Sequence, residues 1–215
     1  QDAFALASHR RAVAARARLA EEIVPVPLPD ASGMMTQDDG PRDGQDEAAL
    51  ARLRPCFDRV AGTVTVGNAC PLTDGAAAAI VCDEELAREL GAPVLGWLTG
   101  WAYAALDGRR MGLGPVHAMA RLQARTGLTL ADVGAIEFME AFAAVAATFR
   151  KRHPAAAERA NESGGHLAMG HPMGASGAIL VATALAEMER KDAEWGVAVA
   201  HAVSGVGCAV LLQRA

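Results

Sequence analysis

The stretch GGHLAMGHPMGASGAIL, residues 164–180, constrains the fold more than any other part of the chain. Its glycines and two histidines open a run of small and aliphatic residues, which predicts a tight turn and then a helix over 178–190. Because that helix is apolar nearly all round, we expect it to be buried. A phosphate loop would need a Lys after these glycines, and a dinucleotide-binding loop would need another glycine spacing.

Two interpretations remain open for the histidines of this stretch, a catalytic role and a structural role in the core. His166 and His171 have no carboxylate or thiol neighbour in the sequence, which argues against a metal site. Pro172 fixes the backbone after His171, and Gly174 follows where the helix is about to begin. Such a histidine can point into a catalytic site, while the N–H groups of the helix start polarise a carbonyl. The alternative is a core histidine bonded to a backbone carbonyl.

The remaining chain alternates helix-like and strand-like patterns, which predicts an α/β fold. Helices are expected at residues 2–22, 47–53, 83–91 and 114–128, and after a short strand (136–138) within 131–152. Other strands are expected at 62–69, 74–83, 93–105, 195–203 and 207–215. Closely spaced prolines make residues 23–29 extended, and 30–46 has the composition of a solvated excursion.

Composition excludes several function classes. The net charge is only −5 and arginine is spread along the chain, so nucleic acid is not an expected partner. No apolar run is long enough for a membrane span. Four cysteines without a paired spacing indicate reduced thiols and a cytoplasmic protein. The chain starts at Gln1 rather than Met, so we expect it to be a fragment or to have lost a preceding segment.

The whole chain resembles thiolases in seven ordered blocks. GGHLAMGHPMGASGA is similar to their glycine-histidine-proline box, and the other blocks are QDAFALASHRRAVAA with EEIVPV, LRPCF, GTVTVGNACPLTDGAAAAIV, MGLGPVHA, FMEAFAA and GVAVAHAVSGVGCAVLLQR. The resemblance implies the layered α/β/α/β/α thiolase fold, of which this chain is the C-terminal half. Residues 1–60 would belong to the loop domain that covers coenzyme A, 61–83 to a strand segment of the N-terminal domain, and 84–215 to the C-terminal domain.

The resemblance also implies an activity in fatty acid metabolism. Thiolases cleave 3-ketoacyl-CoA, or condense acetyl-CoA, by transferring an acyl group through a cysteine in their N-terminal half. This chain has no residue at that position, so it would need an N-terminal half or a catalytic subunit, within a homo- or hetero-oligomer. Coenzyme A and acyl-CoA would be substrates, with no permanently bound cofactor. The alternative is a non-catalytic thiolase-fold subunit that binds acyl-CoA or a partner enzyme.

By the same resemblance, His171 would contact the nucleophilic sulfur and the thioester oxygen of the substrate. Three positions depart from the family pattern. Met139, before Glu140, replaces an asparagine that orients a water in an oxyanion hole, and His201 replaces the acid/base cysteine. Val203 replaces a glycine, and its branched side chain is expected to distort a second oxyanion hole. His201 is either an alternative acid/base or the mark of a lost reaction.

Contacts with coenzyme A are also carried over from the family. Cys70 aligns with a position near the pantetheine, and Met111 begins a loop that lines the same tunnel. Arg42 lies in the segment that meets the nucleotide, although an arginine in such a segment is more often a plain solvated surface residue. His166 is expected to be structural, and the remaining histidines (His9, His117 and His153) are expected at the surface. Residues 1–60 should wrap over another chain or another part of the same chain.

Overall fold

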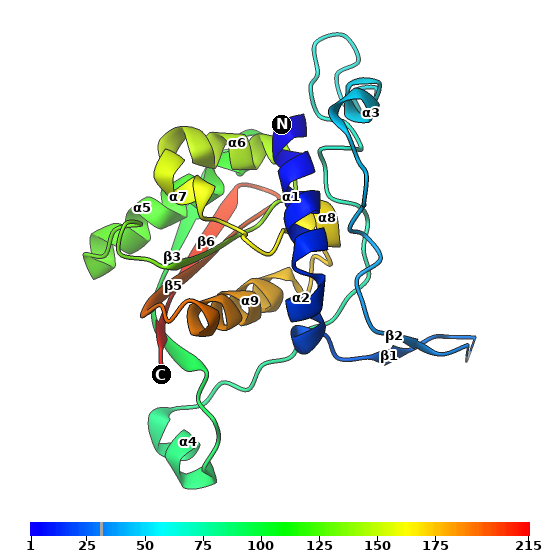
Figure 1. Ribbon diagram of the computed structural model, residues 1–215. Coiled ribbons are helices and arrows are strands. Elements are labelled where there is room, and N and C mark those ends of the chain that lie inside the picture. Colours follow the sequence, from blue (N-terminus) through cyan, green and yellow to red (C-terminus); the bar gives the residue numbers. More distant parts are fainter. Residues whose placement is uncertain (31) are drawn as a thin grey trace. The chain divides into compact units, whose positions relative to one another are not determined.

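The computed structural model describes residues 1–30 and 32–215, which divide into two compact units (Figure 1). The first unit comprises residues 1–74, 140–147 and 161–172. The second unit comprises residues 75–139, 148–160 and 173–215. Each unit is built from segments that are far apart in the sequence, so neither is a simple N- or C-terminal piece.

A mixed four-stranded sheet forms the centre of the second unit. Its strands are β3 (Gly96–Ala105), β4 (Ala135–Phe138), β5 (Trp195–Ala202) and β6 (Val206–Arg214), in the order β3-β6-β5-β4. β4 runs parallel to β5, whereas β6 pairs antiparallel with both of its neighbours. The tight turn between β5 and β6 has positive φ at Ser204 and Gly205.

Two helices pack on this sheet. α5 (Gly114–Thr126) packs on β3, β5 and β6, and α9 (Ser176–Arg190) packs on β4, β5 and β6. A Cβ at Gly100 of β3 would meet Leu122 of α5, whereas a Cβ at Gly196 of β5 would meet Met188 of α9. Because side chains alternate along a strand, the two helices lie on opposite faces of the sheet.

Shorter elements complete the second unit. They are α4 (Glu84–Leu90), the 3-10 helix η1 (Gly108–Leu113), α7 (Pro154–Glu158) and the end of α6 (Ala143–Arg152), whose first half belongs to the first unit. The side chain of Asp83 caps α4, and Gly91 ends it in the left-handed conformation, as the sequence indicates.

The first unit is built around its N-terminal helices. It contains α1 (Asp2–Ala14), α2 (Arg16–Glu22), α3 (Glu47–Ala51) and the four-residue helix α8 (His166–Met169). Ala5 of α1, Ala143 and Leu167 of α8 form one buried cluster. The expected single helix over 2–22 is broken between α1 and α2.

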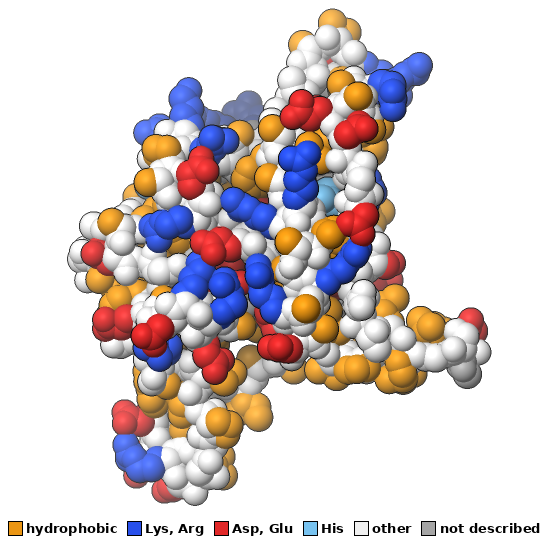
Figure 2. Space-filling view, viewed as in Figure 1, with side chains coloured by type: hydrophobic (Ala, Val, Ile, Leu, Met, Phe, Trp, Pro, Cys, Tyr) orange, Lys and Arg blue, Asp and Glu red, His pale blue; other side chains and the backbone are white. Residues whose placement is uncertain are grey.

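A two-stranded hairpin also belongs to the first unit, formed by β1 (Val26–Pro27) and β2 (Met34–Met35). Its side chains at Val26, Met34 and Met35 are exposed, and Figure 2 shows an apolar surface there. A two-stranded hairpin is marginally stable by itself, so an apolar surface that covers this hairpin would stabilise it.

Three expectations about secondary structure are wrong in detail. Residues 62–69 and 74–83 form no strand, because a strand needs a hydrogen-bonded neighbour, and Ala69 finds only one isolated bridge, to Phe142. The helix after residue 174 is only partly buried: α9 hides Leu180 and Ala184 but leaves Ala182 exposed. The glycine stretch also contains α8, which was not expected.

The close approach of α5 to β6 predicts a strong effect of one methyl group. A Cβ at Gly207 would lie on the carbonyl of Gly114, so Gly207→Ala should lower the free energy of unfolding by about 1–3 kcal/mol. A Cβ added at Gly177 in α9 would meet nothing within 4 Å, so Gly177→Ala should be neutral or stabilise by up to ~1 kcal/mol. Urea unfolding checks both; equal effects would contradict this packing.

Candidate active site

A buried carboxylate lies at the centre of the first unit. Glu140 is 1% exposed, and its Oε2 accepts a hydrogen bond from the Ser8 hydroxyl at 2.7 Å. Its Oε1 accepts from the side-chain amide of Asn161 at 2.6 Å, and Oε2 also accepts from the Leu167 N–H at 3.3 Å. The pKa of Glu140 is raised overall, because burial is the largest influence on it, and these donors and the charge of Arg11 offset that rise only in part.

Glycines let the chain pass close to this carboxylate. A Cβ at Gly165 would run into the carboxylate of Glu140, and a Cβ at Gly164, whose φ is +86°, would meet Ala12 of α1 at 2.6 Å. The Gly165 N–H donates to the Ser8 hydroxyl at 3.0 Å, so that hydroxyl both accepts and donates. The glycine stretch is therefore needed for close packing against α1 and Glu140.

His171 follows directly from this anchored segment. The Gly170 N–H closes α8 by donating to the carbonyl of His166, and the His171 N–H donates to Thr73 Oγ1 at 3.1 Å. A Cβ at Gly170 would collide with the Thr73 side chain. The backbone on both sides of His171 is thus set by α8 and by the segment that contains Thr73, whereas its side chain is only partly buried.

The His171 ring lies against a second imidazole. The centroids of the His166 and His171 rings are 5.2 Å apart with an interplanar angle of 85°. Burial lowers the pKa of His171, which favours a neutral ring at physiological pH. A neutral imidazole can accept a proton at one nitrogen and donate a hydrogen bond from the other, as acyl-transfer chemistry requires. His166 is 4% exposed, so the helix α8 carries a buried histidine beside the candidate one.

Cys70 lies in the same unit, but with the wrong chemistry for a nucleophile. Its N–H donates to the carbonyl of Ala141 at 2.9 Å, next to Glu140, and Thr73 lies three residues further on. Burial raises the pKa of Cys70, which keeps the thiol protonated. Cys70 can therefore line a ligand path but is poorly suited to attack a thioester.

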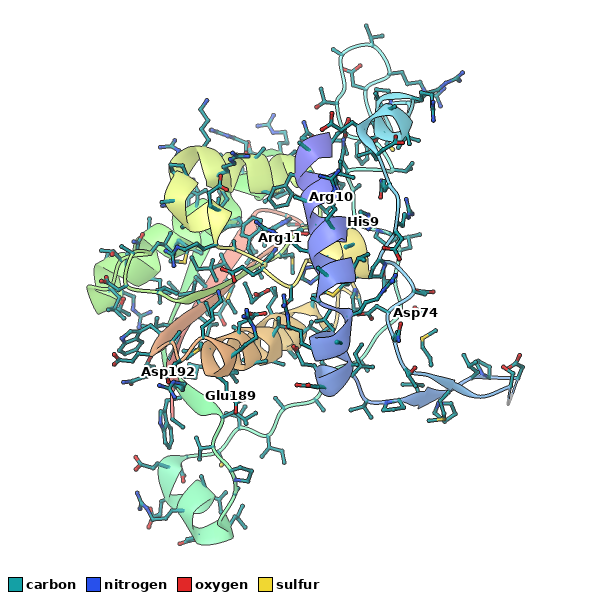
Figure 3. The ribbon with its side chains drawn as sticks, in the orientation of Figure 1. His9, Arg10, Arg11, Asp74, Glu189 and Asp192 are labelled. Carbon is teal, nitrogen blue, oxygen red and sulfur yellow. The ribbon has the colours of Figure 1, made fainter. Side chains whose placement is uncertain are left out.

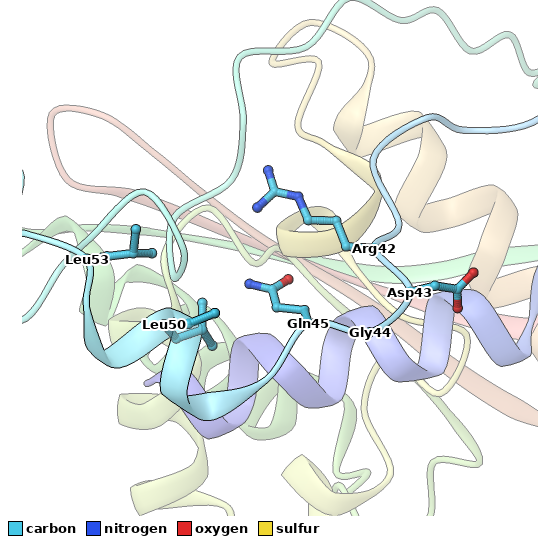
Figure 4. Close-up of a pocket in the computed structure, with 7 residues that line it drawn as sticks. Arg42, Asp43, Gly44, Gln45, Leu50 and Leu53 are labelled. Atoms are coloured by element: carbon cyan, nitrogen blue, oxygen red, sulfur yellow. The ribbon is translucent and has the colours of Figure 1, made fainter.

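Arg42 lies on another side of α1. Its N–H donates to Nδ1 of His9 at 3.2 Å, and Figure 3 places His9 and Arg11 on opposite sides of the helix. Arg42 and Gln45 extend from the same loop into an open groove of about 510 Å³, lined also by Ala49, Leu50 and Leu53 of the α3 region (Figure 4). Asp43 and Gly44 also line this groove, and the Asp43 carboxylate pairs with Arg16 at 2.8 Å.

The other candidate residues belong to the second unit. Met139 is buried in a cluster with Leu180 and Ala198, so its side chain packs as a core residue. His201 in β5 pairs with Gly207 and is 7% exposed, and η1, which contains the half-buried Met111, packs on β5. Gly174 is exposed and precedes α9.

The expected distortion of an oxyanion hole at Val203 stays a prediction. The left-handed positions of the β5–β6 turn are Ser204 and Gly205, and Val203 itself is 71% exposed. Val203 is therefore not at a left-handed position of this turn.

Sequence reasoning missed the polar partners of Glu140 and the burial of His9. Ser8 occurs in the first matching block but is 132 residues from Glu140, and Asn161 has a positive φ of 50°, a conformation that asparagine tolerates well. His9, expected at the surface, is 4% exposed, and His153 is half-buried, whereas His117 is exposed as expected. A Ser at helical spacing from buried alanines was the available signal in α1.

Neither a metal cluster nor a membrane span occurs in the described part of the chain. Among residues 1–30 and 32–215, no group of three His, Cys, Asp or Glu side chains could hold a metal ion. None of the helices within those same ranges is both long enough and apolar enough to cross a membrane.

The burial of His9 predicts a pH dependence of stability. Burial, and then the charge of Arg42, lower the pKa of His9, so the unfolded chain binds more protons just below the ordinary histidine pKa. Stability from His9 should be complete above that pKa and be lost as the pH falls from about 7 to about 5.5. His9→Asn, which keeps an acceptor, should flatten the pH profile of urea unfolding. His117→Asn on α5 is the exposed control, and an unchanged slope in His9→Asn would contradict this explanation.

Comparisons with known proteins agree with this architecture. The family described as "Thiolase, C-terminal domain" matches residues 92–214, and "Thiolase, N-terminal domain" matches residues 1–85. An acetyl-CoA acetyltransferase of Pseudomonas aeruginosa is 42% identical over 219 residues, covering 100% of this chain and 56% of that protein. A 3-ketoacyl-CoA thiolase of Shewanella baltica is 41% identical over 222 residues, covering 100% of this chain and 57% of the relative.

A solved structure shows the same fold. The crystal structure of the Bacillus anthracis acetyl-CoA acetyltransferase superposes with a TM-score of 0.94 at 32% identity, covering 100% of this chain and 55% of that one. The chain spans about half the length of the curated relatives it matches. It has the thiolase fold and belongs to the thiolase family.

Proposed function

We propose that this chain is the C-terminal half of a thiolase-type acyltransferase that acts on 3-ketoacyl-CoA or acetyl-CoA. The observation that carries the proposal is His171: a histidine with a lowered pKa, whose backbone is fixed by Thr73 and the closed turn of α8. The relatives named acetyl-CoA acetyltransferase and 3-ketoacyl-CoA thiolase support the reaction class. Residues 1–60, 61–83 and 84–215 keep the domain assignments expected from the sequence.

In the proposed cleavage, a cysteine thiolate from the N-terminal half attacks the 3-keto carbon of the substrate. The bond between carbons 2 and 3 breaks, and its electron pair leaves on acetyl-CoA as an enolate, which then takes a proton. Free coenzyme A, losing its thiol proton to a base, displaces the cysteine and releases the shortened acyl-CoA. The His171 N–H would stabilise the enolate oxygen, and His201 would exchange the protons.

Arg42, Cys70 and Met111 are the proposed contacts for coenzyme A. The groove beside Arg42 combines a cation with apolar walls at Leu50 and Leu53, a combination that suits a phosphorylated nucleotide. Met139 donates no hydrogen bond, so one oxyanion donor of the family pattern is replaced by core packing. Cytoplasmic location and assembly into an oligomer stay predictions.

Uncovered apolar surface supports the need for a second half. On the face of the sheet that carries α9, Trp101 and Tyr103 of β3 are 48% and 61% exposed. Ile80 and Val81, in the extended segment without a strand partner, are 95% and 83% exposed. Large exposed apolar side chains in such numbers usually mark an interface. The half of the relatives' length that lies outside this chain is the proposed cover.

Loss of the histidines should abolish turnover. In the full-length protein, His171→Ala and His201→Ala should each lower thiolytic cleavage of a 3-ketoacyl-CoA by about 10²-fold or more, because each removes a proton-transfer or oxyanion group. The measurement is the loss of ketoacyl absorbance on adding coenzyme A. His117→Ala, on the exposed side of α5, is the control and should keep normal activity. A fully active His171→Ala enzyme would contradict the proposal, and absent turnover with intact coenzyme A binding would favour a non-catalytic subunit.

The proposed cover can be tested by thiol labelling. Tyr103→Cys should react rapidly with a maleimide when residues 1–215 are expressed alone, and at least about tenfold more slowly in the full-length protein, because buried thiols are inert. Ala124→Cys, exposed on α5, should react equally in both. Peptide mapping separates these sites from the native cysteines. Equal labelling of Tyr103→Cys in both proteins would show that the missing half does not cover this face.

A further inference from the structure

We propose that Glu140 is the positioning residue of the candidate active site: its buried carboxylate, with Ser8 as a relay, fixes α8 and thereby places His171. The inference rests on the proposed function for its catalytic meaning, but its geometry lies wholly in the first unit. Glu140 touches no reacting group in this arrangement, so it acts through the loop that it holds.

The direction of the hydrogen bonds at Glu140 indicates a carboxylate anion. Among residues 1–30 and 32–215, three groups bond to the Glu140 side chain, and all three are donors: the Ser8 hydroxyl, the Asn161 amide and the Leu167 N–H. A carboxylate accepts all three, whereas a neutral amide at position 140 would set one N–H against a donor. A buried anion is stable only when its hydrogen bonds are complete, so the three donors are fixed together.

Glu140 is connected to His171 through the single turn of α8. The Leu167 N–H belongs to the first turn of α8, where backbone donors have no partner within the helix. Gly165, just before α8, is held by the Ser8 hydroxyl, and the Gly170 N–H, just after it, bonds back to His166. One turn of helix therefore separates the anchored end from His171, and a shift at one end moves the other.

The backbone around α8 is tightly packed and has little room to move. The Cβ positions of Gly164, Gly165 and Gly170 would each meet atoms of Ala12, Glu140 and Thr73 respectively, so the backbone is packed on three sides. His166 is part of α8, so its ring, a titratable group in contact with His171, moves whenever α8 moves. A displacement of about 1 Å at a reacting group can cost roughly 10²-fold in rate, which makes the anchor matter for catalysis.

A reciprocal exchange tests the inference in the full-length protein. Glu140→Gln and Asn161→Asp each break the match between donors and acceptors, so each should lower kcat about 10- to 100-fold with little change in KM. The double variant restores the match: the Gln carbonyl accepts from Ser8 and Leu167, and its amide donates to the new carboxylate. Aspartate also tolerates the positive φ at 161. We expect the double variant to regain at least about tenfold over either single variant.

A second readout is independent of turnover. NMR titration of the His171 ring should show its pKa rising toward the ordinary histidine value in Glu140→Gln, because a loosened loop hydrates the ring, and returning in the double variant. If the wild-type protein catalyses no acyl transfer, the proposed function fails, yet this titration still decides the role of Glu140. An unchanged His171 pKa and kcat in a folded Glu140→Gln protein, or no recovery in the double variant, would overturn the inference.

Two further variants distinguish a specific effect on His171 from a general loss of stability. Glu187→Gln removes another buried carboxylate, one paired with Arg190 in the second unit, and should lower stability without changing the His171 pKa. If Glu140→Gln does not fold, Ser8→Ala removes only the relay and frees the Gly165 N–H. It should shift the His171 pKa in the same direction by a smaller amount, and no shift would count against the inference.

Discussion

The hydrogen bonding of one buried carboxylate organises the first unit. Glu140 draws together a helix at the start of the chain, Asn161 and the first turn of α8, which lie up to 132 residues from Glu140 in the sequence. Desolvation makes such an anion costly unless each oxygen is bonded, so the three segments can only be placed together or not at all. The position of His171 is a consequence of this arrangement, and so is the need for glycine at 164 and 165.

Local patterns predicted most elements of the fold. The alternation and capping signals located α4, α5, α9 and all four strands of the main sheet to within a few residues, whereas the helix expected over 2–22 is divided into α1 and α2. They failed where structure depends on a partner. Residues 62–69 and 74–83 have strand composition but pair with no strand of the described residues, and α9, which is apolar nearly all round, leaves Ala182 exposed. A sequence pattern shows what a segment can pair with, but not whether the pairing surface is in the same chain.

The candidate site was predictable only in part. The glycine-histidine stretch and the MEAF segment identified His171 and Glu140 through their resemblance to a family. No local sequence pattern identified the residues that surround them. Thr73 reaches the His171 backbone across 98 residues, and the contact depends on Gly170 having no side chain. Long-range contacts of this kind are decided by packing, which the sequence does not display.

The ionisation state of Glu140 decides whether an anion anchors α8. The ¹³C chemical shift of its Cδ can be followed with pH, together with hydrogen exchange of the Leu167 amide. Burial raises the pKa of Glu140, but the three donors that face its oxygens predict a carboxylate at about neutral pH. Its protonation at lower pH should coincide with lost protection at Leu167. A protonated Glu140 at about neutral pH, with the Leu167 amide still protected, would contradict the claim that an anion holds this loop.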